Sequence, residues 1–117
     1  MPKGVNLMEI KYTNKNLGKR EIYAHTRASA TSLKDVSENF VITPVEIVVY
    51  DDVNSKGETN TITSIIDGNG EHFATNSKFF REELLYINDL MGGEPYDIIV
   101  KKPTSKGGRQ FVTCELV

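Results

Sequence analysis

The chain has 117 residues, a formal net charge of −2 and 38% hydrophobic residues, values typical of one ordinary globular domain. It contains no apolar run long enough to cross a membrane and no signal-peptide apolar region near its first residue. Its single cysteine, Cys114, excludes an internal disulfide and a cysteine-cluster metal site, so we expect a cytoplasmic protein.

Residues 1–39 carry the weakest structural signals and are expected to form an extension packed on the main domain. Leu7 to Thr13 alternates weakly and suggests a strand. Lys19 to Ala28 suggests a short helix, and a helical turn is expected at Leu33 to Val36.

Residues 40–117 read as strand, strand, strand, helix, strand, strand. Phe40 to Tyr50 is rich in β-branched residues and is interrupted by Pro44, which predicts a bulge or bend because proline cannot donate to a ladder. The later strands are predicted at Thr61 to Asp67, His72 to Thr75, Tyr96 to Lys102 and Gln110 to Val117.

A single amphipathic helix is predicted from Ser77 to Met91, capped by Asn76 or Ser77. Its apolar stripe, at i, i+4, i+7 and i+11, consists of Phe80, Leu84, Ile87 and Met91. A helix between the third and fourth of five strands is the element order of the OB-fold. We therefore expect a mainly β protein in which residues 40–117 form a five-stranded OB-fold barrel.

The predicted hairpin between the last two strands carries the strongest functional signal. Lys101, Lys102, Lys106 and Arg109 surround a glycine-containing tip, and Phe111 begins the returning strand. Single-stranded nucleic acid needs cations for its phosphates and aromatic faces for its bases, and this hairpin offers both. The alternative is a solvated basic hairpin that keeps a sheet edge from aggregating.

Four further residues complete the predicted binding surface. Lys56 lies in the loop between the first two strands, the second loop with which OB-folds grip ligands. Tyr50, Thr63 and Thr113 are expected on outer strand faces. Phe111 is expected to face outward too, because the alternate residues of its strand are expected to face the core: Val112, Cys114 and Leu116. Aromatic residues of this kind are more often core or subunit interface than base platforms.

Charge is distributed unevenly along the chain. Residues 1–34 hold seven Lys/Arg and two Glu, residues 35–97 hold three against thirteen acidic residues, and residues 98–117 hold four against one. A locally basic face can bind phosphates whatever the net charge. The N-terminal cations either extend such a face or are simply solvated: Lys11, Lys15, Lys19, Arg20 and Arg27.

Catalytic and cofactor motifs are absent from the sequence. His25 and His72 are far apart and lack an adjacent serine or thiol motif, and no spacing suits a metal site or a phosphate-binding glycine loop. Asp51 and Asp52 are the one acidic pair that a nuclease hypothesis would use. We expect a protein that is not an enzyme and has no cofactor or metal.

Five segments carry a resemblance to a known family: KREIY at 19–23, TSIIDGNG at 63–70, FATNSKFF at 73–80, TSKGGR at 104–109 and FVTCEL at 111–116. They resemble segments of the small single-stranded-DNA-binding proteins of lactococcal-type siphophages. The resemblance implies an OB-fold, a homodimer, and protection of single-stranded DNA in phage DNA replication and recombination. It also implies cooperation with a phage recombinase or annealing protein.

One departure from cellular single-strand binders is that no long acidic, glycine-rich segment follows the last predicted strand. Partner docking is therefore expected to use another surface. The leading hypothesis is a sequence-independent binder of single-stranded DNA. The alternative is a protein–protein interaction module on the same barrel, such as a phage assembly or regulatory factor, which the acidic middle segment favours.

Overall fold

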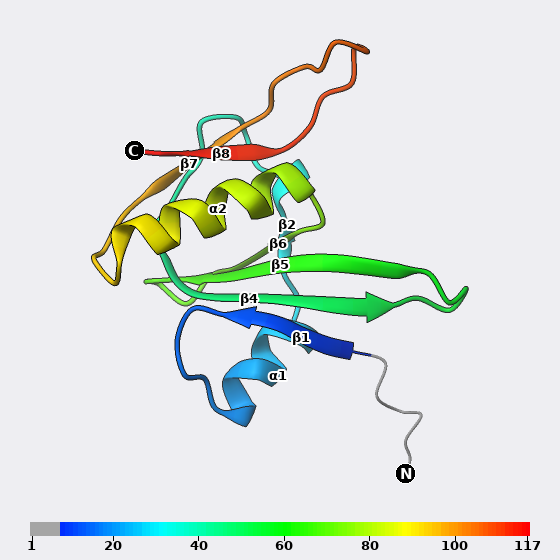
Figure 1. Cartoon of the computed structure of the whole chain (residues 1–117), viewed down its shortest axis with the longest axis vertical. Coiled ribbons are helices and arrows are strands. Elements are labelled where there is room, and N and C mark those ends of the chain that lie inside the picture. The colour runs from blue at the N-terminus through cyan, green and yellow to red at the C-terminus, as the bar shows by residue number, and fades with distance from the viewer. Residues whose placement is uncertain (1–7) are drawn as a thin grey trace.

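The computed structural model describes residues 8–117, and Figure 1 shows the arrangement of its elements. The elements in chain order are β1 (Met8–Thr13), α1 (Lys19–Arg27), β2 (Thr31–Ser32), the 3-10 turn η2 (Leu33–Asp35), β3 (Val41–Ile42), β4 (Pro44–Val53), β5 (Thr59–Asp67), β6 (His72–Thr75), α2 (Lys78–Met91), β7 (Ile98–Lys101) and β8 (Thr113–Leu116). Leu7, the first residue of the expected N-terminal strand, lies outside the described residues. Neither helix has the length and apolar character needed to span a bilayer.

The strands form two sheets that share one stretch of chain. One sheet has the order β1-β4-β5-β6-β2 and the other β3-β7-β8. Only Thr43 separates β3, which pairs with β7, from β4, which pairs with β5. The register of the β4–β5 pairing shifts between Pro44 and Glu46. The bend predicted at Pro44 is therefore confirmed, and it is the point where the chain passes between the sheets.

The two sheets do not join along their other sides. β2 occupies the outer edge of β6 in a parallel pairing, whereas β8 pairs with β7. Within residues 8–117 the sheets therefore do not close into a barrel. The mainly β class is confirmed. Because the expected first strand is divided at Thr43 into β3 and β4, α2 follows the fourth strand of residues 40–117 rather than the third.

The apolar core lies between the five-stranded sheet, α2 and the three-stranded sheet. Phe80, Leu84 and Ile87 of α2 are buried there against residues such as Ile65 and Val100. The Ser77 hydroxyl accepts a hydrogen bond from the Phe80 amide and caps the helix, as predicted. Gly92, at φ 59°, ends it in a left-handed conformation that glycine adopts without strain.

Helix α1 covers the opposite face of the five-stranded sheet, so that both faces are buried. Thr63, Ser64 and Ile65 are consecutive on β5 and each is 0% exposed, because alternate residues face the core and α1. The expectation that Thr63 and Tyr50 face solvent was therefore wrong. Tyr50, between Ile10 of β1 and Ile62 of β5, is only 8% exposed.

Two neighbouring phenylalanines of α2 provide a matched test of the core. Phe80 is 0% exposed and Phe79 is 57% exposed. Phe80→Ala should lower the free energy of unfolding by about 3–5 kcal/mol, whereas Phe79→Ala should cost about 1 kcal/mol or less. Urea titration of both variants measures the difference. Equal losses would contradict this placement of α2.

Candidate functional site

A shallow groove of about 360 Å³ runs between the end of β6, the start of α2 and the segment that enters β8. We call it the β6–β8 groove. Its lining includes Lys34, Asn76, Lys78, Phe79, Gln110 and Phe111. These residues come from three parts of the chain that are distant in sequence, and the fold brings them together.

Two aromatic rings form the apolar part of this groove. The ring centroids of Phe79 and Phe111 lie 4.8 Å apart with planes tilted by 46°. The Ser77 hydroxyl donates a hydrogen bond to the Val112 carbonyl, which fastens the start of α2 to the segment that carries Phe111. The aromatic pair is thus held by both elements while Phe79 keeps more than half of its surface in solvent.

Two lysines and a neighbouring hollow extend the groove. Lys34 and Lys78 both line it. The Lys78 ammonium is 3.9 Å from the Glu82 carboxylate, but both side chains are mostly exposed, and such pairs are weak. A second hollow of about 250 Å³ is also lined by Lys34 and reaches Ile62 and Ala74 on the sheet. Polar and cationic groups therefore follow a continuous surface from the aromatic pair across β6.

The predicted basic hairpin contributes only in part. Lys106 and Arg109 are exposed at a tip that projects away from the body in Figure 1. The Lys101 ammonium donates to the Asn39 side-chain oxygen at 2.7 Å. The Lys102 ammonium donates to the backbone carbonyls of Lys34 and Val36. Lys102 therefore has a structural task, which is to hold the chain around η2.

The other predicted binding residues are dispersed. Lys56 is exposed at the β4–β5 tip, which lies at the right of Figure 1, apart from the β7–β8 tip at its top. Thr113 is half-buried and pairs with Lys101. Tyr50 and Thr63, being buried, cannot reach a ligand. Of the predicted residues, only Phe111 lines the β6–β8 groove.

Sequence reasoning missed Phe79, Lys78 and Lys34 as members of a site. One signal was present, because adjacent residues on a helix point about 100° apart. Phe79 and Phe80 therefore could not both face the core. Lys34 had no such signal, since its place depends on the packing of η2 beside β6.

The N-terminal cations do not continue the groove. Lys11 lies 3.3 Å from Glu9 and 3.5 Å from Asp51, and its partners raise the pKa of its ammonium. Lys19, Arg20 and Arg27 lie on α1, which is on the far side of the five-stranded sheet from α2 (Figure 1).

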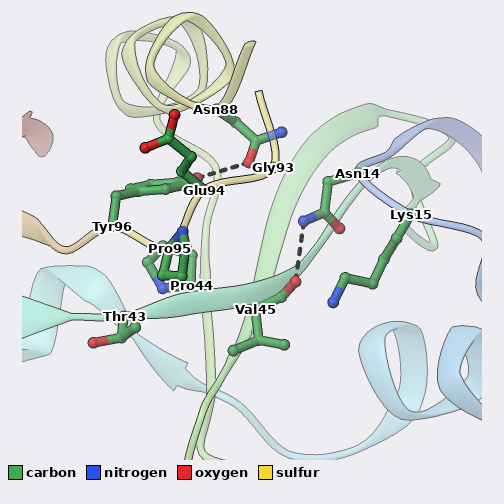
Figure 2. A pocket seen from close by; sticks show the side chains of 10 residues that line it. All are labelled: Asn14, Lys15, Thr43, Pro44, Val45, Asn88, Gly93, Glu94, Pro95 and Tyr96. Carbon is green, nitrogen blue, oxygen red and sulfur yellow. Dashed lines mark hydrogen bonds between the residues drawn. The ribbon is translucent and has the colours of Figure 1, made fainter. Parts of the chain in front are cut away.

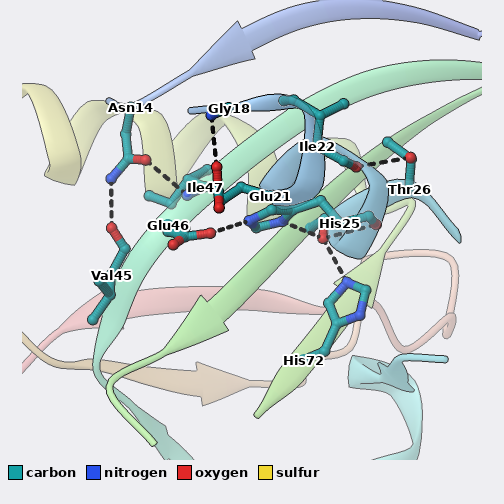
Figure 3. Close-up of polar contacts among 11 residues, drawn as sticks. Asn14, Gly18, Glu21, Ile22, His25, Thr26, Val45, Glu46, Ile47 and His72 are labelled. Carbon is teal, nitrogen blue, oxygen red and sulfur yellow. Dashed lines mark hydrogen bonds and ion pairs between the residues drawn. The ribbon is translucent and has the colours of Figure 1, made fainter. Parts of the chain in front are cut away.

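The two histidines, isolated in sequence, meet in the fold (Figure 3). His25 lies 2.8 Å from the Ser64 hydroxyl through Nδ1 and 3.0 Å from the Glu46 carboxylate through Nε2. The Ser64 hydroxyl also lies 2.7 Å from His72 Nε2. Ser64 is 0% exposed, so its oxygen cannot attack a substrate despite this Ser–His–Glu arrangement. The network instead fastens α1 to the sheet.

A pocket of about 400 Å³ lies at the other end of α2, beside the β3–β4 junction (Figure 2). Its amide side chains are already occupied. The Asn14 amide donates to the Val45 carbonyl at 3.0 Å, and Asn88 accepts from the Tyr96 hydroxyl at 2.8 Å. These contacts hold the surrounding loops, and only Lys15 and Glu94 offer exposed charges there.

Cys114 is 2% exposed, as its predicted place in the core requires. Burial, together with the nearby charges of Glu83 and Glu115, raises the pKa of its thiol to about 12. Across the described part of the chain, no three His, Cys, Asp or Glu side chains are grouped in a way that could hold a metal ion.

Comparison of the chain with protein-family models, with curated proteins and with solved structures gives no match. The resemblance to phage single-strand binders therefore stays an expectation from the sequence.

The histidine network predicts a loss of stability in mild acid. Burial lowers the pKa of both His25 and His72 below the ordinary 6.5, and the charge of His25 adds to this effect on His72. The unfolded chain then takes up protons before the folded one, so the free energy of unfolding falls as pH drops below that value. Urea titrations at pH 7.5 and 5.5 measure this, and His72→Gln should flatten the dependence. Equal stability at the two pH values would contradict it.

Proposed function

We propose that the protein binds single-stranded DNA without sequence preference and without catalysis, and that the β6–β8 groove receives the bases. The observation that carries this proposal is the pair of Phe79 and Phe111, held at 4.8 Å in a groove lined by Lys34 and Lys78. An exposed aromatic ring beside cations is what an unpaired nucleotide requires.

Stacking and charge have separate tasks in this proposal. Every base has a π-face, so a phenylalanine platform accepts any sequence. Lys34 and Lys78 would neutralise phosphates that pass the groove, and Lys106 and Arg109 on the β7–β8 hairpin would meet the strand further along. Duplex DNA keeps its bases stacked and paired, and cannot offer them to Phe79 and Phe111. The preference for single strands follows from that difference.

The strand arrangement supports an OB-fold. If β3 and β4 are counted as the two halves of one bent strand, that strand pairs with both β5 and β7. The β7–β8 hairpin then corresponds to the fourth-to-fifth strand loop, and β5 and β6 to the ligand-binding strands of that fold. The groove lies along the open seam between β6 and β8. A role in phage DNA replication and recombination, with a phage recombinase or annealing protein as partner, rests on the resemblance in sequence.

Truncating the aromatic pair tests the platform. Phe79→Ala and Phe111→Ala should each weaken binding to a short oligo-dT by about 10- to 100-fold, since a stacked base contributes about 1–3 kcal/mol. Fluorescence anisotropy with an oligonucleotide of about ten residues, within the usual site size of such folds, measures this. Tyr86→Ala removes an exposed aromatic outside the groove and should leave the affinity unchanged.

Binding of duplex as tight as binding of oligo-dT would contradict the proposal. Absence of any DNA binding would favour the protein–protein module instead.

The salt dependence of binding separates the groove lysines from Lys102. Each phosphate contact on a single strand contributes about 0.7 to the slope of log affinity against log salt. The double variant Lys34→Ala/Lys78→Ala should therefore lower the slope by about 1.4. Lys102→Ala should instead lower the free energy of unfolding and keep the slope, because its ammonium holds backbone carbonyls. A lower slope in Lys102→Ala alone would reverse this assignment.

A further inference from the structure

Helix α1 presents a basic face with an aromatic residue within it. Arg20, Tyr23 and Arg27 follow at i, i+3 and i+7, which places them on one side of the helix. All three are exposed, and Tyr23 keeps 68% of its surface in solvent. The opposite side of α1 carries His25, which is buried against the sheet.

Helix α2 presents an acidic face that is also built around an aromatic residue. Glu82, Tyr86 and Asp89 follow at i, i+4 and i+7, and Leu90 lies beside them. Tyr86 and Leu90 are 64% and 61% exposed. These two large side chains give the acidic face an exposed apolar centre that a partner can cover.

The charged and aromatic residues of the two helix faces have the same spacing when one helix is read in the opposite direction. Arg20, Tyr23 and Arg27 read forward have the same spacing as Asp89, Tyr86 and Glu82 read backward. In each helix seven residues, or about 10.5 Å, separate the outer charges. Antiparallel docking would set Arg20 against Asp89, Tyr23 against Tyr86 and Arg27 against Glu82.

The faces cannot meet within one chain. α1 and α2 lie on opposite sides of the five-stranded sheet, as Figure 1 shows. Among residues 8–117, Arg20, Arg27 and Asp89 have no ion-pair partner, and Glu82 has only the weak contact with Lys78. These charges are therefore available to another molecule.

We propose that α1 of one copy docks antiparallel on α2 of the next copy of this chain. The two surfaces lie on opposite sides of the five-stranded sheet, so the contact repeats head to tail. It builds a row of copies, which stays open unless the rotation from one copy to the next closes it into a ring. The use of that row, which is cooperative coverage of a DNA strand, rests on the function proposed above. A weak contact suffices there, because neighbours bound to one strand have a high effective concentration.

Charge reversal tests the contact directly. Arg20→Glu/Arg27→Glu and Glu82→Arg/Asp89→Arg should each abolish concentration-dependent association in sedimentation velocity at low salt, without DNA. Combining all four substitutions restores opposite charges and should restore association. Glu71→Arg/Glu115→Arg makes the same change in net charge as the α2 variant, lies on neither helix, and should associate like the wild type.

A wild type that stays monomeric over the whole concentration range would overturn the inference. So would a four-substitution variant that is folded by circular dichroism but does not associate. Binding of a short oligo-dT provides a separate readout and should be retained in every variant, since none of these residues lines the β6–β8 groove. Association without oligo-dT binding would refute only the proposed function, and binding without association would refute only the head-to-tail contact.

Discussion

The break at Thr43 and Pro44 is the constraint on which the rest of the architecture depends. Because proline cannot donate to a ladder, the strand leaves one sheet at Ile42 and joins the other within a few residues. That single bend places the three-stranded sheet on the other side of α2 from the five-stranded sheet (Figure 1). The space between the sheets is filled by α2, whose first turn then lies beside the segment that enters β8. The groove is a result of this packing, and no local sequence motif encodes it.

Local signals in the sequence predicted the kind and order of the elements of residues 40–117, although the last strand begins at Thr113 rather than at Gln110. The β-branched run before Tyr50, the strand expected from Thr61 to Asp67 and the stripe of Phe80, Leu84 and Ile87 each predicted an element that the structure contains. The covering of the outer sheet face was not predictable in the same way. α1 is fastened there by a polar network around His25, so it carries no apolar stripe that would reveal its docking. For that reason Tyr50 was expected in solvent. Thr63 was assigned to the wrong face, because it lies two residues from Ile65 on β5 and shares its core-facing side.

The candidate site shows the same division between local and distant information. Clustered cations in the C-terminal hairpin are visible in the sequence, but their roles are not. The Lys102 ammonium turns inward to backbone carbonyls. Lys34 lies more than seventy residues before Phe111 in the sequence, but both residues line the same groove. A side chain's partners across the fold decide whether its charge supports the structure or is free for a ligand. Sequence patterns report only the charge.

The burial of Cys114 has a practical consequence for studying this molecule. A thiol that stays protonated and is shielded by the core reacts slowly with maleimides and similar reagents. A cysteine introduced at a solvent-facing position would therefore take up a fluorophore selectively, with the native residue left in place. Paired dyes on separate molecules would then test the proposed contact between neighbouring copies. Single-molecule fluorescence experiments therefore do not require replacement of Cys114.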